Sequence, residues 1–299
     1  GNFKEGISTI SHSTPDPIAA PEPPEPRAGS ILPELQKAQQ IVDIKGVLLT
    51  KSQIDESVMF LLNKQAMDQM HFVNCGLHDK DLHVLGTAVR KSPANPVVLN
   101  FSFNPLTVNC VDDLLALAKD KPSIEAILLQ GTHLGDEGIQ KLVDGLLKQH
   151  REKFNKDGDV AEATITSSDS VDFDNVKELH ELDLTKSGIG DKGVKALCTL
   201  IRSDMAIDTL NLSLNKGITL EGWKELSQAI QKTRHLETLT LDHNHIGNEG
   251  IEELTKGLFE NTSILALDLN NIGITDQGGK FIIELLKRNT SILEINLAG

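Results

Sequence analysis

A repeat unit of 28 or 29 residues governs much of this 299-residue chain. One apolar residue recurs with spacings of 28, 29, 28 and 28 residues, at Leu182, Leu210, Leu239, Leu267 and Ile295. A fixed period of this length over five units is typical of a solenoid, in which each repeat packs only on its neighbours. We therefore expect a stack of similar layers.

Each unit joins two hydrophobic periods. Segment 236–241 reads Leu-x-x-Leu-x-Leu, and this period of two predicts a half-buried strand. Segment 250–258 reads Gly-Ile-x-x-Leu-x-x-x-Leu, and this period near 3.6 predicts an amphipathic helix. A polar residue between the two is expected to satisfy backbone groups in a tight turn, at Cys75, Asn104, Thr132, Ser187, Asn215 and Asn244. Ile272 replaces it in one repeat, which leaves that turn in question.

Two further side chains in the repeat suggest structural roles. A helix N-cap acceptor is expected two residues after the aliphatic residue of the turn, at Asp79, Asp136, Asp191, Asn248 and Asp276. Trp223 aligns with the apolar helix positions Val194 and Ile251, so we expect it in the core.

Other segments precede or interrupt the repeats. Residues 1–30 contain six prolines and are expected to form a disordered arm, with recognition by a proline-binding groove as the alternative. Residues 31–46 are predicted to form a capping helix, because apolar residues recur there at helical spacing. About nine repeats then fill residues 47–299. Residues 151–176 are polar and acidic, which predicts an inserted loop; a degenerate repeat is the alternative.

Composition excludes several kinds of partner. The net charge of −14 would repel phosphate backbones, so nucleic acid is not expected as a partner. No segment has the roughly 18–20 consecutive apolar residues of a membrane span. Three scattered cysteines imply no disulfide framework and favour a reducing, cytoplasmic location. The sequence does not indicate an oligomeric state.

The pattern Leu-x-x-Leu-x-Leu-x-x-Asn-x-Ile-Gly-x-x-Gly, from Leu236 to Gly250, resembles the leucine-rich repeats of ribonuclease inhibitor. It is also similar to the repeat domains of Ran GTPase-activating protein and of innate immune receptors. The resemblance implies an α/β fold, a right-handed leucine-rich-repeat solenoid shaped like a horseshoe. Parallel strands would line its concave face, and helices would cover its convex face.

In such a horseshoe, residues between and just after the strand leucines face the hollow and are candidates for partner binding. The C-terminal candidates are Asp183, Asn211, Thr240, Asp242, His243, Asp268 and Asn270. Their polar, acidic character fits a partner protein with a basic or polar surface. The alternative is that they are ordinary solvated strand residues.

We therefore expect a non-enzymatic scaffold or adaptor, with no catalytic residue and no cofactor. The cluster from Asp242 to His245 lacks a third suitably spaced ligand, so no metal site is expected. One alternative from the resemblance is a regulator of a small GTPase. None of the six arginines falls on a predicted concave strand, which leaves an arginine finger without support. A further alternative is an inhibitor or sensor module of a larger receptor.

Overall fold

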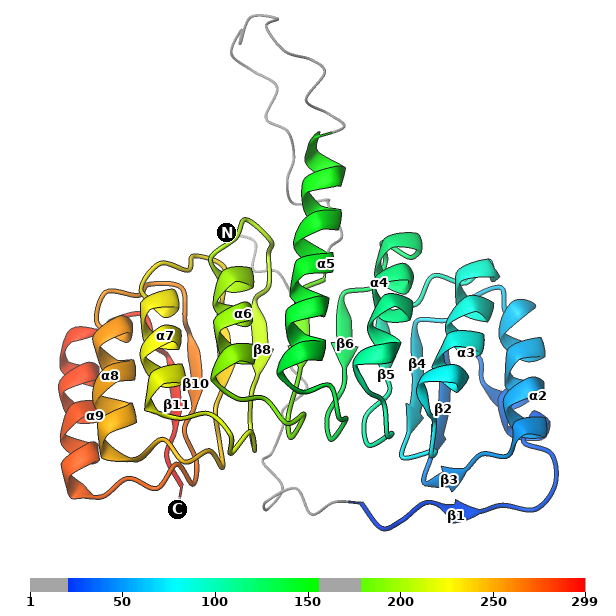
Figure 1. Ribbon diagram of the computed structural model, residues 1–299, viewed down its shortest axis with the longest axis horizontal. Helices are drawn as coiled ribbons and strands as arrows, with labels where there is room; N and C mark the ends of the chain where they lie inside the picture. Colours follow the sequence, from blue (N-terminus) through cyan, green and yellow to red (C-terminus); the bar gives the residue numbers. More distant parts are fainter. Residues whose placement is uncertain (1–20, 156–178, 299) are drawn as a thin grey trace, which may run out of the picture.

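The computed structural model describes residues 21–155 and 179–298. Strands and helices alternate along the described chain and form an arc, with the strands as its concave layer and the helices as its convex layer (Figure 1). Nine of the described strands form one sheet in the order β11-β10-β9-β8-β7-β6-β5-β4-β2, with every pair parallel. The chain is a right-handed α/β solenoid, as predicted.

The bounds of the elements follow the repeat. The strands of the sheet are β2 (Ile41–Lys45), β4 (Gln69–Val73), β5 (Val98–Asn100), β6 (Ala126–Leu128), β7 (Glu181–Asp183), β8 (Thr209–Asn211), β9 (Thr238–Thr240), β10 (Ala266–Asp268) and β11 (Glu294–Asn296). The helices are α1 (Leu32–Lys37), α2 (Lys51–Leu62), α3 (Asp79–Lys91), α4 (Val111–Asp120), α5 (Gly135–Asn155), α6 (Asp191–Ile201), α7 (Leu220–Ile230), α8 (Gly247–Leu258) and α9 (Asp276–Arg288), with a 3-10 helix η1 (Val108–Cys110) before α4.

The periodic anchors of the sequence become one row of the core. Leu182, Leu210, Leu239, Leu267 and Ile295 are direct partners across β7 to β11, and the four leucines are at most 2% exposed. A spacing of one repeat in the sequence is thus a spacing of one strand in space. Trp223 is fully buried, which confirms its predicted place in the core.

The predicted turn residues satisfy backbone groups between layers. The amide nitrogen of Asn104 donates to the carbonyl oxygens of Phe72 (2.6 Å) and Phe101 (2.8 Å). Its amide oxygen accepts from the backbone N–H groups of Cys75 (2.9 Å) and Leu77 (3.0 Å). The turn at Ile272 lacks such an amide but keeps the backbone of the turns at Cys75 and Ser187, with left-handed residues on both sides of it, Asn271 and Gly273.

The predicted helix N-caps are wrong, and the side chains concerned have another role. Asp191 lies inside the first turn of α6, and its carboxylate reaches the following repeat. One oxygen accepts from the N–H groups of Thr219 (2.8 Å) and Gly222 (3.1 Å), and the other accepts from the Thr219 hydroxyl (2.7 Å). A Cβ at Gly222 would lie 2.5 Å from that carboxylate, so glycine is needed to admit the side chain of the preceding repeat.

Replacing Asp191 with alanine is therefore expected to lower the free energy of unfolding by about 2 kcal/mol, because two N–H groups and a hydroxyl lose a charged acceptor. Asp276 is the matched control. It holds the equivalent place in α9, the last described helix, where its main contribution is to the helix dipole. Asp276→Ala should lower the free energy by about 0.5 kcal/mol. Urea denaturation would measure both, and equal losses would contradict the inter-repeat role.

The N-terminal region differs from the prediction of a capping helix over residues 31–46. Helix α1 ends at Lys37, and residues 41–45 form strand β2. Val42 and Ile44 are buried while their neighbours are exposed, so the local period is two and the segment pairs in register with β4. The first repeat therefore begins before residue 47. The apolar spacing that predicted one helix comes from a short helix followed by a strand.

Part of the proline-rich arm is ordered. Strand β1 (Glu25–Pro26) pairs with β3 (Val47–Leu48) in a separate two-stranded sheet. The buried side chain of Gln53 donates to the carbonyl oxygens of Arg27 (3.0 Å) and Gly29 (2.7 Å), which holds the arm against the first repeat. Residues 1–20 lie outside the described residues. Of the predicted loop at 151–176, residues 151–155 belong to α5 and the rest lies outside the described residues.

Candidate functional site

Four of the seven predicted binding residues lie side by side on the concave face. Asp183, Asn211, Thr240 and Asp268 are direct partners across β7, β8, β9 and β10. Each is the third residue of its strand and follows a buried leucine, so its side chain points away from the core. Neighbouring strands of a sheet lie about 4.8 Å apart, so the row is continuous.

Hydrogen bonds to the backbone fix these side chains. One carboxylate oxygen of Asp183 accepts from the N–H (2.9 Å) and the hydroxyl (2.6 Å) of Thr185. Asn211 makes the same two bonds to Ser213, at 3.0 and 2.6 Å. Asp268 accepts from the N–H of Asn270 (3.0 Å). Asp183, Asn211 and Asp268 thus stabilise the turns after β7, β8 and β10 and are held in one orientation before any partner arrives.

The other three predicted residues lie in those turns. The Nδ1 of His243 is 2.7 Å from an Asp242 carboxylate oxygen, and its Nε2 is 3.1 Å from the amide nitrogen of Asn271. The imidazole therefore joins the Asp242 carboxylate of its own turn to the Asn271 amide of the next repeat. Asn270 is 5% exposed and accepts from the N–H of Ala298, so its role is structural.

Several acidic residues of this face were missed from the sequence. Glu181 and Glu294 are the first residues of β7 and β11 and share a side of the strand with Asp183 and Asn296. Counting two residues back from each predicted site would have found them, because side chains of a strand alternate between faces. The residues just before the strands form a separate row at the entrance to the sheet, with Glu125, His180, Asp208 and Glu237, which neighbouring backbone hydrogen bonds align.

The electrostatics of the face reflect this concentration of carboxylates. Burial raises the pKa of Asp268, and the nearby Asp242 carboxylate raises it further, while the Asn270 N–H opposes the shift. The Asp208 carboxylate, 3.5 Å from His180 Nδ1, raises the pKa of that imidazole against the effect of burial. The pKa shift of His180 is that of a neighbouring carboxylate that favours a bound proton, whereas the pKa shift of Asp268 comes mainly from burial.

The outward positions of β7 to β11 contain four acidic side chains and no lysine or arginine. These positions are Glu181, Asp183, Thr209, Asn211, Thr238, Thr240, Ala266, Asp268, Glu294 and Asn296. The corresponding positions of β5 and β6 are neutral, at Val98, Asn100, Ala126 and Leu128. Among the strands from β5 to β11, the acidic outward positions therefore begin at β7.

Other chemistry finds little support in the described chain. Residues 21–155 and 179–298 contain no group of three or more His, Cys, Asp or Glu side chains arranged to hold a metal ion. Cys75, Cys110 and Cys198 are free thiols, and burial raises the pKa of each to about 12, which keeps them protonated and unreactive. Among the helices of the described segments, none has the length and apolar character needed to cross a membrane.

Comparisons with known proteins agree with the repeat architecture. A family model described as "Leucine Rich repeat" matches residues 178–198 and 232–254. Tonsoku-like protein of Bos taurus is 30% identical over 152 residues, which cover 50% of this chain and 9% of that protein. Ribonuclease inhibitor of Mus musculus is 24% identical over 194 residues, which cover 63% of this chain and 42% of that protein. The matches thus span less than half the length of either relative.

A solved structure, the TLR13-ssRNA13 complex, aligns with a TM-score of 0.45 and 11% identity, over 89% of this chain and 34% of that chain. The stacked 28- and 29-residue units, the helix in every layer, the family model and the similarity to ribonuclease inhibitor lead to one assignment. The chain is a leucine-rich-repeat protein whose repeats belong to the ribonuclease-inhibitor-like subclass.

Proposed function

We propose that this protein is a non-enzymatic scaffold or adaptor that binds a protein with a basic surface through the concave face of β7 to β11. The observation that carries the proposal is the set of ten outward positions with four carboxylates and no cationic side chain. The relatives are repeat proteins, which supports protein interaction as the general role. Three free thiols support a reducing compartment such as the cytoplasm.

The geometry favours recognition by charge. Asp183 and Asp268 are short side chains held by backbone N–H groups, so little conformational entropy is lost when they meet a partner. The ten outward positions hold no aromatic side chain, so the face lacks the usual anchors of a tight interface. Charge complementarity then provides specificity and a fast association rate, and salt should weaken the complex.

The test is the binding of a fluorescent arginine-rich peptide to a variant with Glu181→Gln, Asp183→Asn and Asp268→Asn. Asparagine keeps the turn, as Asn211 demonstrates. We expect the dissociation constant at low salt to rise about tenfold or more, because three charges that face the peptide are lost.

The matched control removes three carboxylates from the helical layer, with Asp144→Asn, Glu221→Gln and Glu249→Gln. The net charge of the protein changes by the same amount, but the concave face is untouched. This variant should bind within about twofold of the wild type. Equal weakening of both variants would show that only total charge matters and would contradict the proposed face.

The alternative of small-GTPase regulation has no structural observation in its favour. The six arginines of the protein lie in the arm (Arg27), in helices (Arg90, Arg151, Arg288), at the C-cap of α6 (Arg202) and in the loop after α7 (Arg234). None of these positions is on the concave face, where an arginine finger would have to stabilise the negative charge of the GTP-hydrolysis transition state. Measurement of stimulated GTP hydrolysis would test the alternative directly.

A further inference from the structure

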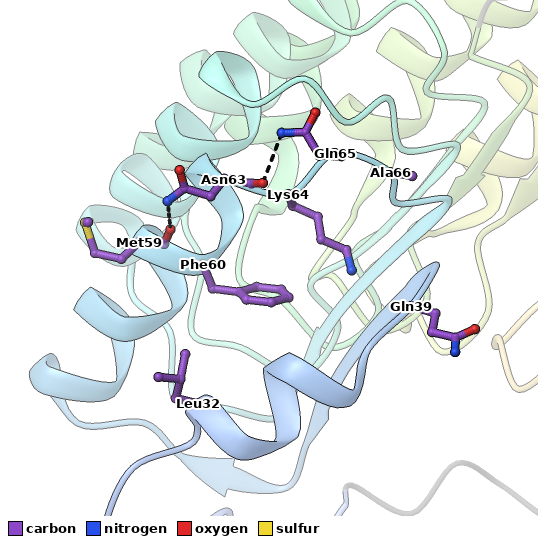
Figure 2. Close-up of a pocket in the computed structure, with 8 residues that line it drawn as sticks. All are labelled: Leu32, Gln39, Met59, Phe60, Asn63, Lys64, Gln65 and Ala66. Carbon is purple, nitrogen blue, oxygen red and sulfur yellow. Dashed lines mark hydrogen bonds between the residues drawn. The ribbon is translucent and has the colours of Figure 1, made fainter.

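A second surface of different character lies at the N-terminal end of the arc. A hollow of about 500 Å³ opens between α1, the loop that leads into β2, and the C-terminal end of α2 (Figure 2). We infer that this hollow is a docking site for a partner segment that presents a large apolar side chain next to a carboxylate. This site is independent of the concave face and would take a ligand of opposite charge.

The apolar part of the hollow is built from the first two helices. Its lining includes Leu32 of α1 and Met59 and Phe60 of α2, and Met59 is 61% exposed. In the next repeat, the position equivalent to Phe60 is Ala88, which the stack buries almost completely. The end of the stack thus leaves a phenylalanine half-buried and a flexible methionine exposed beside α1, and methionine adapts readily to a bound side chain.

The only charged side chain of the lining is a lysine. Lys64 Nζ donates to the carbonyl oxygen of Ala38 and lies 5.2 Å from the centre of the Phe60 ring. Two repeats further along the chain, Lys121 makes the same kind of bond to the carbonyl oxygen of Ser92 (2.7 Å), but Lys121 is only 6% exposed. Lys64 is half-buried in the wall of an open hollow, and an ammonium group has three protons to donate.

Polar groups without charge complete the rim. Gln39, Asn63 and Gln65 contribute amides, and the eight lining residues include no acidic side chain. An apolar floor beside one ammonium group matches an apolar side chain followed by a carboxylate. The amide nitrogens of Asn63 and Gln65 already donate to the carbonyl oxygens of Met59 and Asn63, which leaves their amide oxygens for the peptide N–H groups. A basic segment would place its charge against Lys64, so the hollow selects against the class of partner that suits the concave face.

The test compares two fluorescein-labelled peptides by anisotropy: one with a central leucine and phenylalanine flanked by glutamates, and the same peptide with lysines in place of the glutamates. The glutamate peptide should bind the full chain. Met59→Ser and Lys64→Met should each weaken it at least about fivefold, because each removes one of the two features recognised. Leu293→Ser is the matched control, since Leu293 is 81% exposed at the other end of the arc, and it should have no effect.

Thermal unfolding of each variant would verify that the fold is retained, and Met59→Ser leaves the Lys64 bond to Ala38 in place. The concave variant described above should bind the glutamate peptide like the wild type, which separates this site from the proposed function. Equal binding of the two peptides, or the same effect of Met59→Ser and Leu293→Ser, would overturn the inference.

Discussion

Replacement of Asn104 by alanine is expected to lower the free energy of unfolding by about 4 kcal/mol, one of the largest effects of a single substitution in this protein. Asn104 is 1% exposed, and its amide serves two N–H groups and three carbonyl oxygens in two adjacent layers. Alanine would leave the N–H groups of Cys75 and Leu77 buried without an acceptor, at about 1–3 kcal/mol for each group. Urea denaturation followed by circular dichroism would measure the loss.

Asn244 provides the matched control, because it holds the equivalent place with fewer hydrogen bonds. Its amide nitrogen donates to the carbonyl oxygens of Leu212 and Leu241, but its amide oxygen has no partner. In the preceding repeat, the turn from Asn215 to Ile218 contains one additional residue. The N–H of Ile218 therefore bonds to the carbonyl oxygen of Asn215 and not to the amide oxygen of Asn244.

Since Leu212 also accepts from the side chain of Asn215, Asn244→Ala should lower the free energy by less than about 2 kcal/mol. Equal losses at Asn104 and Asn244 would show that the volume of the side chain, and not its hydrogen bonds, determines stability. A stack of repeats can also unfold in steps, so the m-value should be compared between the variants before the free energies are.

The repeat architecture could be predicted because it depends on spacing alone. A strand anchor every 28 or 29 residues leaves one way to align the leucines, and Leu210 and Leu239 meet as the period requires. The N-terminal end was harder, since residues 31–46 have one short helix and one strand whose apolar residues together imitate a longer helix. The end of a stack has a neighbour on one side only, and the repeat therefore constrains it least.

The candidate site was predicted in part. The row of Asp183 and Asp268 followed from the alternation of side chains in a strand. Sequence gave no sign that Asn270 is buried under the next repeat, because that depends on the close approach of two turns. The role of Asp191 was missed for a similar reason: its acceptors lie one repeat later, at Thr219 and Gly222, and a local N-cap pattern looks the same.

Gly257 shows a further contact that no periodicity reveals. It lies inside α8, where glycine is unfavourable by roughly 1 kcal/mol relative to alanine. A Cβ at this position would lie 2.1 Å from the carbonyl oxygen of Ser227 in α7 and 2.8 Å from its hydroxyl oxygen. That hydroxyl also accepts from the Gly257 N–H (3.0 Å), so backbone and side chain meet directly. The two helices pack this closely only because residue 257 has no side chain.

Gly257→Ala is thus expected to lower the free energy of unfolding by about 2–3 kcal/mol, since the strain of forcing α7 and α8 apart outweighs the gain in helix propensity. Gly279, in α9, is the matched control: a Cβ there would meet nothing within 4 Å. Gly279→Ala should raise the free energy by about 0.5–1 kcal/mol, so the two substitutions should have opposite signs in urea denaturation. Stabilisation by both would mean that α7 and α8 can separate without loss. The close packing of these helices would then add nothing to the stability of the stack that supports the concave face of β7 to β11.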